Sequence, residues 1–287
     1  MSHQQPNSHS QESRRPSTVL ESVAELREQI RRGRTVDESA SPPGAHPAED
    51  DTLVFRPTHR PTMAVLYVLD DGCQESEVIR IRGDLFVIGR AEGDLVIPHD
   101  DALSGRHLEI SRRLENGHFR WYLKDLGSSN GTFVRVASAL LSHEQVIVIG
   151  SRSYRFEAVM PGSAAWGPSA AGRPTPSTRR LLPDPSSDAD AGQIPALVEL
   201  SVSGGTRRCP LNHAEVWFGR SPQKSSLVLD DPMVSPRHGC LRRDSKGRWR
   251  VDNAGSLNGV WLRIQELPLD RSGYFQCGEQ RFAIKIP

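Results

Sequence analysis

The sequence predicts an all-β protein that consists of two β-sandwiches. Between about residues 63 and 160, short apolar runs such as MAVLYVL, DLFVIG and QVIVIG alternate with turn residues and are rich in Val, Ile, Phe and Tyr. A similar succession runs from Pro195 to the end of the chain. The length of 287 residues suits two domains of about 100–150 residues each. This length favours two domains over one large core, and because no long helical period interrupts either succession, each is predicted to be an all-β sandwich.

Two other segments lack the apolar content of a core. Residues 1–60 and 161–194 are rich in Ser, Pro and charged residues, so we predict a largely disordered tail and a flexible linker. The two predicted domains then span 61–160 and 195–287. Within the tail, Thr18 and Glu21 have capping-box spacing, apolar residues recur on one helical face, and Gly33 follows as a stop signal. This pattern predicts a short amphipathic helix over 18–33.

Composition excludes several classes of function. The formal net charge of +1 provides no broad basic face for nucleic acid or an anionic membrane. No run of about 18 apolar residues is present to span a bilayer. The four cysteines, at positions 73, 209, 240 and 277, have no C-x-x-C spacing and fit a reducing compartment. We therefore expect a cytoplasmic protein with no cofactor, no metal, and neither nucleic acid nor membrane as a partner.

Both successions of strands carry the same three short motifs in the same order. In the first, Gly89-Arg90 is followed by Ser104 and His107, and then by the turn Ser128-Ser129-Asn130-Gly131. In the second, Gly219-Arg220 is followed by Ser235 and His238, and then by Ser256-Leu257-Asn258-Gly259. The spacing from arginine to serine is 14 residues, then 15, and from serine to asparagine 26, then 23. Because the order and spacing of the motifs are duplicated, we interpret the constellation as a site.

The residue types in this constellation suit a phosphorylated peptide. An arginine after a strand-end glycine presents a planar fork of donors that matches phosphate oxygens. Serine hydroxyls on neighbouring turns add uncharged donors. The asparagine of an Asn-Gly turn has both a donor and an acceptor to offer a peptide backbone. Together they predict a loop-built pocket that binds a phosphorylated peptide.

The motifs G-R, S-x-x-H and S-x-N-G, in this order and present twice, resemble those of the forkhead-associated (FHA) domain. The resemblance covers about residues 63–160 and 195–287. It implies an eleven-stranded β-sandwich whose end loops bind phosphothreonine peptides.

The resemblance also implies a role for each matching residue. Arg90 and Ser104 would hold the phosphate, Ser129 would add a hydroxyl, and Asn130 would bind the peptide main chain. His107 would brace the loop from inside, and Gly89 and Gly131 would serve backbone geometry. The second domain matches with the binding residues Arg220, Ser235 and Asn258 and the structural residues Gly219, His238 and Gly259.

Two departures from the family pattern rank the domains. The position after the pocket serine often carries a side chain that reaches the phosphate, but it is Gly105 in the first domain and Pro236 in the second. The position before the asparagine is often Ser or Thr, which Ser129 satisfies and Leu257 does not. We therefore expect the first domain to be the better phosphopeptide binder.

Three alternative interpretations of the sequence are less favoured. Ser104 and His107 could be a nucleophile and its base, but a working site also needs an acidic orienter and an oxyanion site, and Asp100 and Asp101 are expected to face solvent. Zinc could in principle use Cys209, His213, His238 and Cys240, but their spacings lack a zinc-knuckle pattern. The basic run 242–250 could contact nucleic acid, but its pattern favours a solvated hairpin. We predict that the protein is not an enzyme.

The tail contains a candidate phosphosite. Thr52 follows Glu49, Asp50 and Asp51 and precedes Leu-Val-Phe. This segment is similar to the one that precedes the domain in short actinobacterial FHA regulators, where a kinase-modified threonine folds back onto its own FHA pocket. The resemblance implies that phosphorylated Thr52 competes for Arg90 and Ser104. The alternative is that Thr52 only begins an extended lead-in to the first strand.

The predicted function is a phosphothreonine-peptide-binding adaptor in Ser/Thr-kinase signalling. Its expected partners are phosphothreonine-containing proteins, with a Ser/Thr kinase or the substrates of such a kinase among them. The alternative is a phospho-independent scaffold, in which the sandwiches bind protein surfaces and Arg90 is incidental.

Overall fold

The computed structural model describes residues 18–22, 63–69, 77–159, 194–200 and 207–287, and in these ranges it contains β-strands and no α-helix. The predicted all-β class is therefore confirmed. The short strand β1 spans Thr18–Leu20. We call residues 63–159 the first half and residues 194–287 the second half. The first half contains β2 (Val65–Leu69), β3 (Glu77–Arg80), β4 (Leu85–Gly89), β5 (Leu95–Val96), β6 (Leu108–Glu115), β7 (His118–Asp125), β8 (Thr132–Leu141), β9 (Val146–Ile149) and β10 (Arg152–Glu157). The second half contains β11 (Ala196–Leu200), β12 (Arg208–Pro210), β13 (Glu215–Gly219), β14 (Leu227–Val228), β15 (Gly239–Arg243), β16 (Trp249–Asn253), β17 (Val260–Ile264), β18 (Glu266–Leu269), β19 (Gly273–Cys277) and β20 (Gln280–Lys285).

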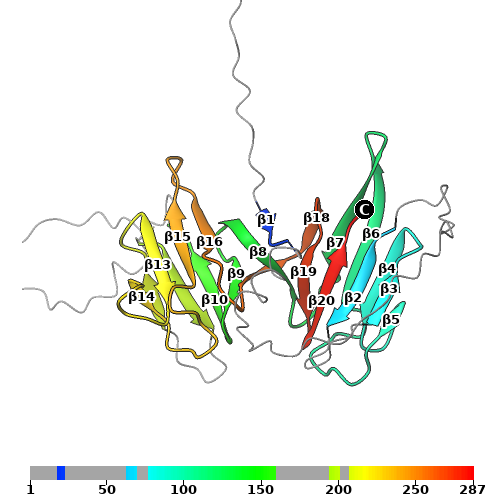
Figure 1. Ribbon diagram of the computed structural model, residues 1–287, viewed down its shortest axis with the longest axis horizontal. Helices are drawn as coiled ribbons and strands as arrows, with labels where there is room; N and C mark the ends of the chain where they lie inside the picture. Colours follow the sequence, from blue (N-terminus) through cyan, green and yellow to red (C-terminus); the bar gives the residue numbers. More distant parts are fainter. Residues whose placement is uncertain (1–17, 23–62, 70–76, 160–193, 201–206) are drawn as a thin grey trace, which may run out of the picture.

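The strands form two sandwiches that lie side by side (Figure 1). In sandwich I, the layer β5-β4-β6-β7-β18 faces a layer made of β3, β2, β20, β19 and the start of β8. In sandwich II, the layer β14-β13-β15-β16 continues into the end of β8 and faces β12-β11-β10-β9-β17. Each sandwich thus has the two-layer architecture predicted from the sequence.

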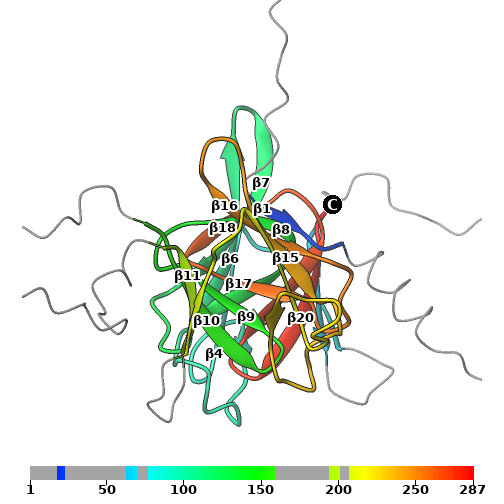
Figure 2. The same cartoon turned by 90° about the vertical axis from the view of Figure 1, so that its left-hand side faces the viewer.

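Each sandwich is completed by strands from the other half of the chain. In sandwich I, β20 pairs with β2 and β18 pairs with β7. In sandwich II, β10 pairs with β11 and β8 pairs with β16. This exchange can be followed in the colours, with the red β20 beside the cyan β2 in Figure 1 and the green β10 beside the yellow-green β11 in Figure 2. The two halves are therefore interleaved, in an intramolecular form of domain swapping.

The chain crosses between the sandwiches along β8 and β17. These strands pair antiparallel, with Thr132 opposite Ile264 and Val136 opposite Val260. Val136 and Val260 have no exposed surface. Because β8 is ten residues long, its start can pair with β19 in sandwich I while its end pairs with β16 in sandwich II. The crossing is thus a buried part of the sheet, and the core continues through it.

Core contacts also join the halves. The largest cluster of buried apolar residues contains side chains from both halves. Phe156 on β10 packs against Trp249 on β16, with ring centroids 6.3 Å apart. The core side chains come from strands in which buried and partly buried residues alternate, as in β2. Burial of such aromatic side chains is a major source of stability, so the core itself resists separation of the halves.

The tail docks as a strand where a helix was predicted. Residues Thr18–Leu20 pair antiparallel with β8, and β1 lies beside β8 in both views (Figure 1, Figure 2). The prediction of a helix beginning at Thr18 is wrong for these residues, and 23–33 lie outside the described part. The physical reason is tertiary: the edge of β8 supplies backbone partners, and the Glu21 side chain is bound to Arg135 and Asn253.

Candidate functional site: two three-loop surfaces

In sandwich I, the end of β4 brings the first arginine against the serine loop. The Arg90 amide donates to the Ser104 carbonyl at 2.9 Å. A Cβ added at Gly89 would lie 2.2 Å from the carbonyl oxygen of Gly105, so only glycine fits this close approach. The Arg90 guanidinium is exposed and donates to Asp101 Oδ1 at 3.2 Å. It is therefore positioned at its backbone and accessible at its charged end.

The other two loops meet beside this arginine. The Ser129 amide donates to Ser104 Oγ at 3.1 Å, and Asn130 Nδ2 donates to the Ala102 carbonyl at 2.8 Å. Ser129 and Asn130 are exposed, and Ser104 is half-buried. The structure thus brings Arg90, Ser104, Ser129 and Asn130 together on one surface formed by three loops.

His107 connects these loops from inside. Its Nδ1 accepts from the Ser104 amide at 3.1 Å, so Nε2 carries the proton and donates to the Gly131 carbonyl at 3.2 Å. The ring has no exposed surface. Burial lowers the pKa of His107, and the hydrogen bond to Gly131 and nearby carboxylates only partly offset this. A neutral imidazole is the form that can make both bonds at once.

Asp125 fixes the turn that carries the asparagine. Its carboxylate accepts from the Ser128 amide and hydroxyl and from the Thr132 hydroxyl. Burial alone would raise the pKa of Asp125, but these hydrogen bonds outweigh it and lower the pKa. The turn is therefore held by a charged group at neutral pH.

The second surface repeats this geometry in sandwich II. The Arg220 amide donates to the Ser235 carbonyl at 3.0 Å, and the Leu257 amide donates to Ser235 Oγ at 3.4 Å. His238 accepts from the Ser235 amide at 3.1 Å and donates to the Gly259 carbonyl at 2.9 Å. Asn258 Nδ2 donates to the Met233 carbonyl at 2.8 Å. Gly219 is as crowded as Gly89, since an added Cβ would lie 2.4 Å from the Pro236 carbonyl oxygen.

Comparison with known proteins assigns these two regions to one family. The model of the FHA domain family matches residues 86–150 and 216–272, which contain both three-loop surfaces. These two regions belong to the FHA domain family. FHA domains are interaction modules that bind phosphothreonine, as the sequence resemblance implied.

Individual relatives cover parts of the chain. The FHA domain-containing protein FhaB of Mycolicibacterium smegmatis and that of Mycobacterium tuberculosis are each 34% identical over 67 residues, which is 23% of this chain and 41% of the relative. The chain therefore spans less than half the length of these curated relatives. Among solved structures, full-length yeast Pml1p is 28% identical, with a TM-score of 0.23 over 24% of this chain and 55% of that one. The FHA domain of CT664 from Chlamydia trachomatis is 22% identical, with a TM-score of 0.23 over 32% of this chain and 93% of that one.

The two FHA surfaces differ in charge and polarity. Pro232 occupies the position that Asp101 occupies in the first surface, and the Arg220 guanidinium makes no hydrogen bond to any described residue. Leu257 and Met233, beside Asn258, are 63% and 55% exposed. The second surface thus combines an uncompensated arginine with an apolar rim.

A buried aspartate links each FHA surface to the other half of the chain: Asp100 in the first surface and Asp231 in the second. The sequence analysis did not predict this role for either residue. Asp100 accepts from the Ala102 amide and, across the halves, from the Glu279 amide at 2.8 Å. Asp231 accepts from the Met233 amide and, across the halves, from the Ser151 amide at 2.7 Å. The expectation that Asp100 faces solvent is wrong, because it is only 5% exposed. Their shared place before the pocket serine was the one available signal.

The residues considered for a zinc site and for nucleic-acid binding take part in structural contacts instead. His238 uses both ring nitrogens on backbone groups, and burial raises the pKa of the Cys209 and Cys240 thiols. In the described ranges, no three His, Cys, Asp or Glu side chains gather in a way that could hold a metal ion. The basic run forms the β15–β16 hairpin, in whose turn Asp244 accepts from the Lys246 and Arg248 amides. Thr52 lies outside the described residues.

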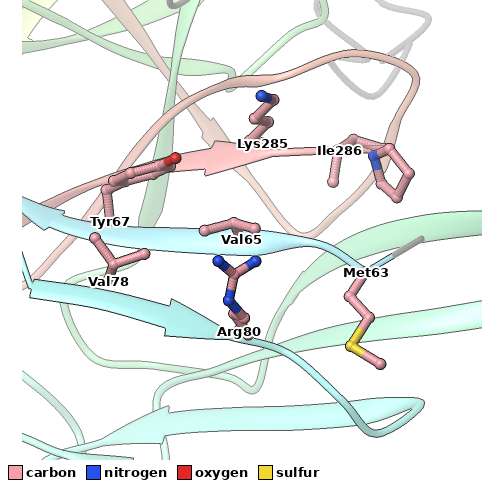
Figure 3. A pocket seen from close by; sticks show the side chains of 8 residues that line it. Met63, Val65, Tyr67, Val78, Arg80, Lys285 and Ile286 are labelled. Atoms are coloured by element: carbon pink, nitrogen blue, oxygen red, sulfur yellow. The ribbon is translucent and has the colours of Figure 1, made fainter. Parts of the chain in front are cut away.

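One depression lies apart from both FHA surfaces. It is found among β2, β3 and β20 in sandwich I, where Arg80 and Lys285 stand beside Val65 and Tyr67 (Figure 3). Its lining residues are Met63, Val65, Tyr67, Val78, Arg80, Lys285, Ile286 and Pro287, and they include no predicted site residue.

No helix in the described part of the chain is long and apolar enough to cross a membrane.

Proposed function

We propose that this protein is a phosphothreonine-peptide-binding adaptor in Ser/Thr-kinase signalling, with one recognition surface on each sandwich. The observation that carries the proposal is the convergence of Arg90, Ser104 and Asn130 on one exposed surface, braced by a buried neutral His107. A guanidinium and hydroxyls are donors that phosphate oxygens accept, and the one histidine behind them has both ring nitrogens bound to backbone groups. The surface therefore suits binding better than catalysis.

Each residue has a role that follows from its contacts. Arg90 supplies the charged fork, and Ser104 supplies its hydroxyl proton, because its oxygen already accepts from the Ser129 amide. Asn130 keeps its side-chain oxygen free while its Nδ2 bonds the Ala102 carbonyl. That oxygen can accept from a peptide amide next to the phosphothreonine. Arg220, Ser235 and Asn258 would act in the same way on sandwich II.

We propose that the first surface binds phosphothreonine peptides more tightly than the second. It offers the additional Ser129 hydroxyl where the second offers the apolar Leu257. The Arg90–Asp101 pair opposes this ranking, since a phosphate must displace Asp101. Both side chains are exposed, however, and such pairs contribute only about 0–1 kcal/mol. One more hydrogen bond to a doubly charged phosphate outweighs that cost.

Thr52 gives the first surface a candidate internal ligand. Phosphorylated Thr52 would carry a charge of roughly −2 and would be tethered to the same chain as Arg90, at high effective concentration. Autoinhibition then predicts that a kinase-phosphorylated protein binds an external phosphopeptide more weakly than the unmodified protein, and that Thr52→Ala restores binding. Equal affinity of the two forms would contradict this part of the proposal.

Replacing Arg90 separates an adaptor from a phospho-independent scaffold. In the full chain, we expect Arg90→Ala to abolish binding of sandwich I to phosphothreonine peptides selected from a library, while Arg82→Ala, which changes an exposed arginine outside the three loops, leaves binding intact. Partner capture from a lysate should also fail after phosphatase treatment. Capture that survives both Arg90→Ala and phosphatase would support the scaffold instead.

A further inference from the structure

A residue of the first half holds the recognition loop of the second FHA surface. Arg135 lies on β8, where its side chain is 5% exposed. Its Nη2 donates to the carbonyl oxygens of Ser256 and Leu257, each at 3.1 Å. Leu257 is the residue whose amide reaches Ser235 Oγ. Arg135 therefore fixes the same peptide units that position the pocket serine.

The tail residue Glu21 holds Arg135 in turn. Its carboxylate is 4% exposed and accepts a hydrogen bond from Arg135 Nε. Asn253 Nδ2 lies 3.4 Å from both Glu21 oxygens, and Asn253 Oδ1 accepts from the Ser256 amide at 3.1 Å and from its hydroxyl at 2.6 Å. Glu21, Arg135 and Asn253 thus form one buried polar network around Ser256. Networks of this kind stay ordered only when every member is satisfied.

The first surface lacks this network, although it has the matching arginine. Arg263 approaches Gly131 as Arg135 approaches Gly259, with the arginine Nε 2.4 and 2.5 Å from a Cβ added at the glycine. The Arg263 side chain is exposed, however, and its guanidinium makes no hydrogen bond to a described residue. The Arg263 carbonyl accepts from Gln145 Nε2, whereas the Arg135 carbonyl accepts from the Glu21 amide. The two halves therefore differ in how the matching arginine is held, buried and bound to a carboxylate in one and exposed in the other.

We propose that Arg135 and Glu21 are positioning residues of the second phosphopeptide surface, and that docking of strand β1 keeps its recognition loop, residues 255–258, in an ordered conformation. This inference rests on the proposed function. A buried arginine that loses its carboxylate is an uncompensated charge, so it moves toward water and releases the two loop carbonyls. Release of β1 thus weakens phosphopeptide binding at sandwich II and leaves sandwich I unchanged. The tail becomes a control element for one surface of the pair.

The test uses the full chain with Arg90→Ala, so that only the second surface can bind a phosphothreonine peptide. Glu21→Gln removes the charge and keeps the shape of the side chain. We expect amide hydrogen exchange in residues 255–258 to accelerate roughly tenfold or more, and affinity for the peptide to fall by a similar factor. Arg135→Lys, which keeps the charge but loses the planar fork, should do the same in part. Arg263→Lys is the matched control and should change neither loop.

The two readouts separate this inference from the proposed function. Unchanged exchange at 255–258 in both Glu21→Gln and Arg135→Lys would overturn the inference. Equal acceleration across β13 and β15 would also overturn it, because it would indicate a general role in stability. Faster loop exchange in a protein that shows no peptide binding even with Glu21 intact would support the positioning role, and would count against phosphopeptide binding by sandwich II.

Discussion

Asp231 of the second half accepts two hydrogen bonds from Ser151 of the first half, from its amide at 2.7 Å and from its hydroxyl at 2.8 Å. The mirror contact joins Asp100 of the first half to the Glu279 amide of the second half at 2.8 Å. Each aspartate also accepts from an amide in the loop that carries the pocket serine. Each recognition surface is thus supported by a turn between two strands of the other half.

The exchange of strands predicts which engineered cysteines can be oxidised to a disulfide. Lys124 on β7 and Glu266 on β18 lie opposite each other and outside the core. We expect Lys124→Cys with Glu266→Cys to form a disulfide within one chain under mild oxidation, detectable by mass spectrometry of the linked peptides.

A second pair supplies the control for the cross-link. Asp252 occupies in the second half the place of Lys124 in the first, because the Leu126 and Ala254 amides bond the His107 and His238 carbonyls in the same way. In a sandwich closed by its own strands, Glu266 would lie opposite Asp252. A disulfide between cysteines at 252 and 266, without one between 124 and 266, would contradict the exchange.

Removing Asp231 should destabilise the whole chain. Asp231→Ala removes the acceptor of the Ser151 and Met233 amides, whose hydrogen bonds are partly buried, and we expect each lost bond to cost about 0.5–1.5 kcal/mol of unfolding free energy. Asp231→Asn keeps an acceptor and should cost less. Urea unfolding followed by tryptophan fluorescence measures the difference, with exposed Asp230→Ala as the control. Equal stability of Asp231→Ala and the control would contradict the role of this link.

The sequence could predict the two surfaces but not their support. The G-R, S-x-x-H and S-x-N-G motifs lie within single halves, so their order along the chain was enough to bring Arg90, Ser104 and Asn130 together. The exchange leaves the kinds of contact unchanged: Asp100 meets Gly278-Glu279 where Asp231 meets Gly150-Ser151. Because the closing strands of the two halves have similar patterns, nothing local distinguishes one pairing from the other.

The conformation of strand β1 could not be predicted from the local sequence either. The spacing of Thr18 and Glu21 fits a capping box as well as it fits a docked strand, and the choice depends on Arg135, more than a hundred residues away. A local pattern has no access to such a partner, and tertiary contacts override helix propensity.

The buried histidines predict a loss of stability in mild acid. Burial lowers the pKa of His107 and of His238. Below a pH of about 6.5, the ordinary histidine pKa, the unfolded chain therefore binds more protons than the native one. The free energy of unfolding should be full above that pH and should fall as the pH drops below it. Urea unfolding at several pH values from about 7.5 to 5 measures the slope.

Replacing His107 tests the source of that slope. His107→Gln should lower stability at neutral pH and reduce the dependence on pH, whereas His99→Gln, at an exposed position, should leave both nearly unchanged. A free energy of unfolding that is constant or rises as the wild-type protein is brought from about pH 7 to 5 would contradict the neutral, buried state of these rings.

Gly105 offers a way to strengthen the first surface. A Cβ added there meets only the Ala91 Cβ at 4.0 Å, so a side chain fits. Gly105→Arg places a second guanidinium next to Ser104, and we expect phosphothreonine peptides to bind roughly three- to tenfold more tightly. Gly105→Ala serves as the control for loss of the glycine. Binding by Gly105→Arg that is no tighter than that of Gly105→Ala would show that the phosphate does not lie beside this position.

Under the proposed function, each sandwich binds phosphothreonine through its own arginine. Calorimetric titration of the full chain with a phosphothreonine peptide should give two sites per chain in the wild type and one in Arg90→Ala or Arg220→Ala. The double variant, Arg90→Ala with Arg220→Ala, should bind none, and the unphosphorylated peptide should not bind the wild type. Binding that persists in the double variant, or that does not depend on the phosphate, would show that Arg90 and Arg220 do not recognise phosphothreonine.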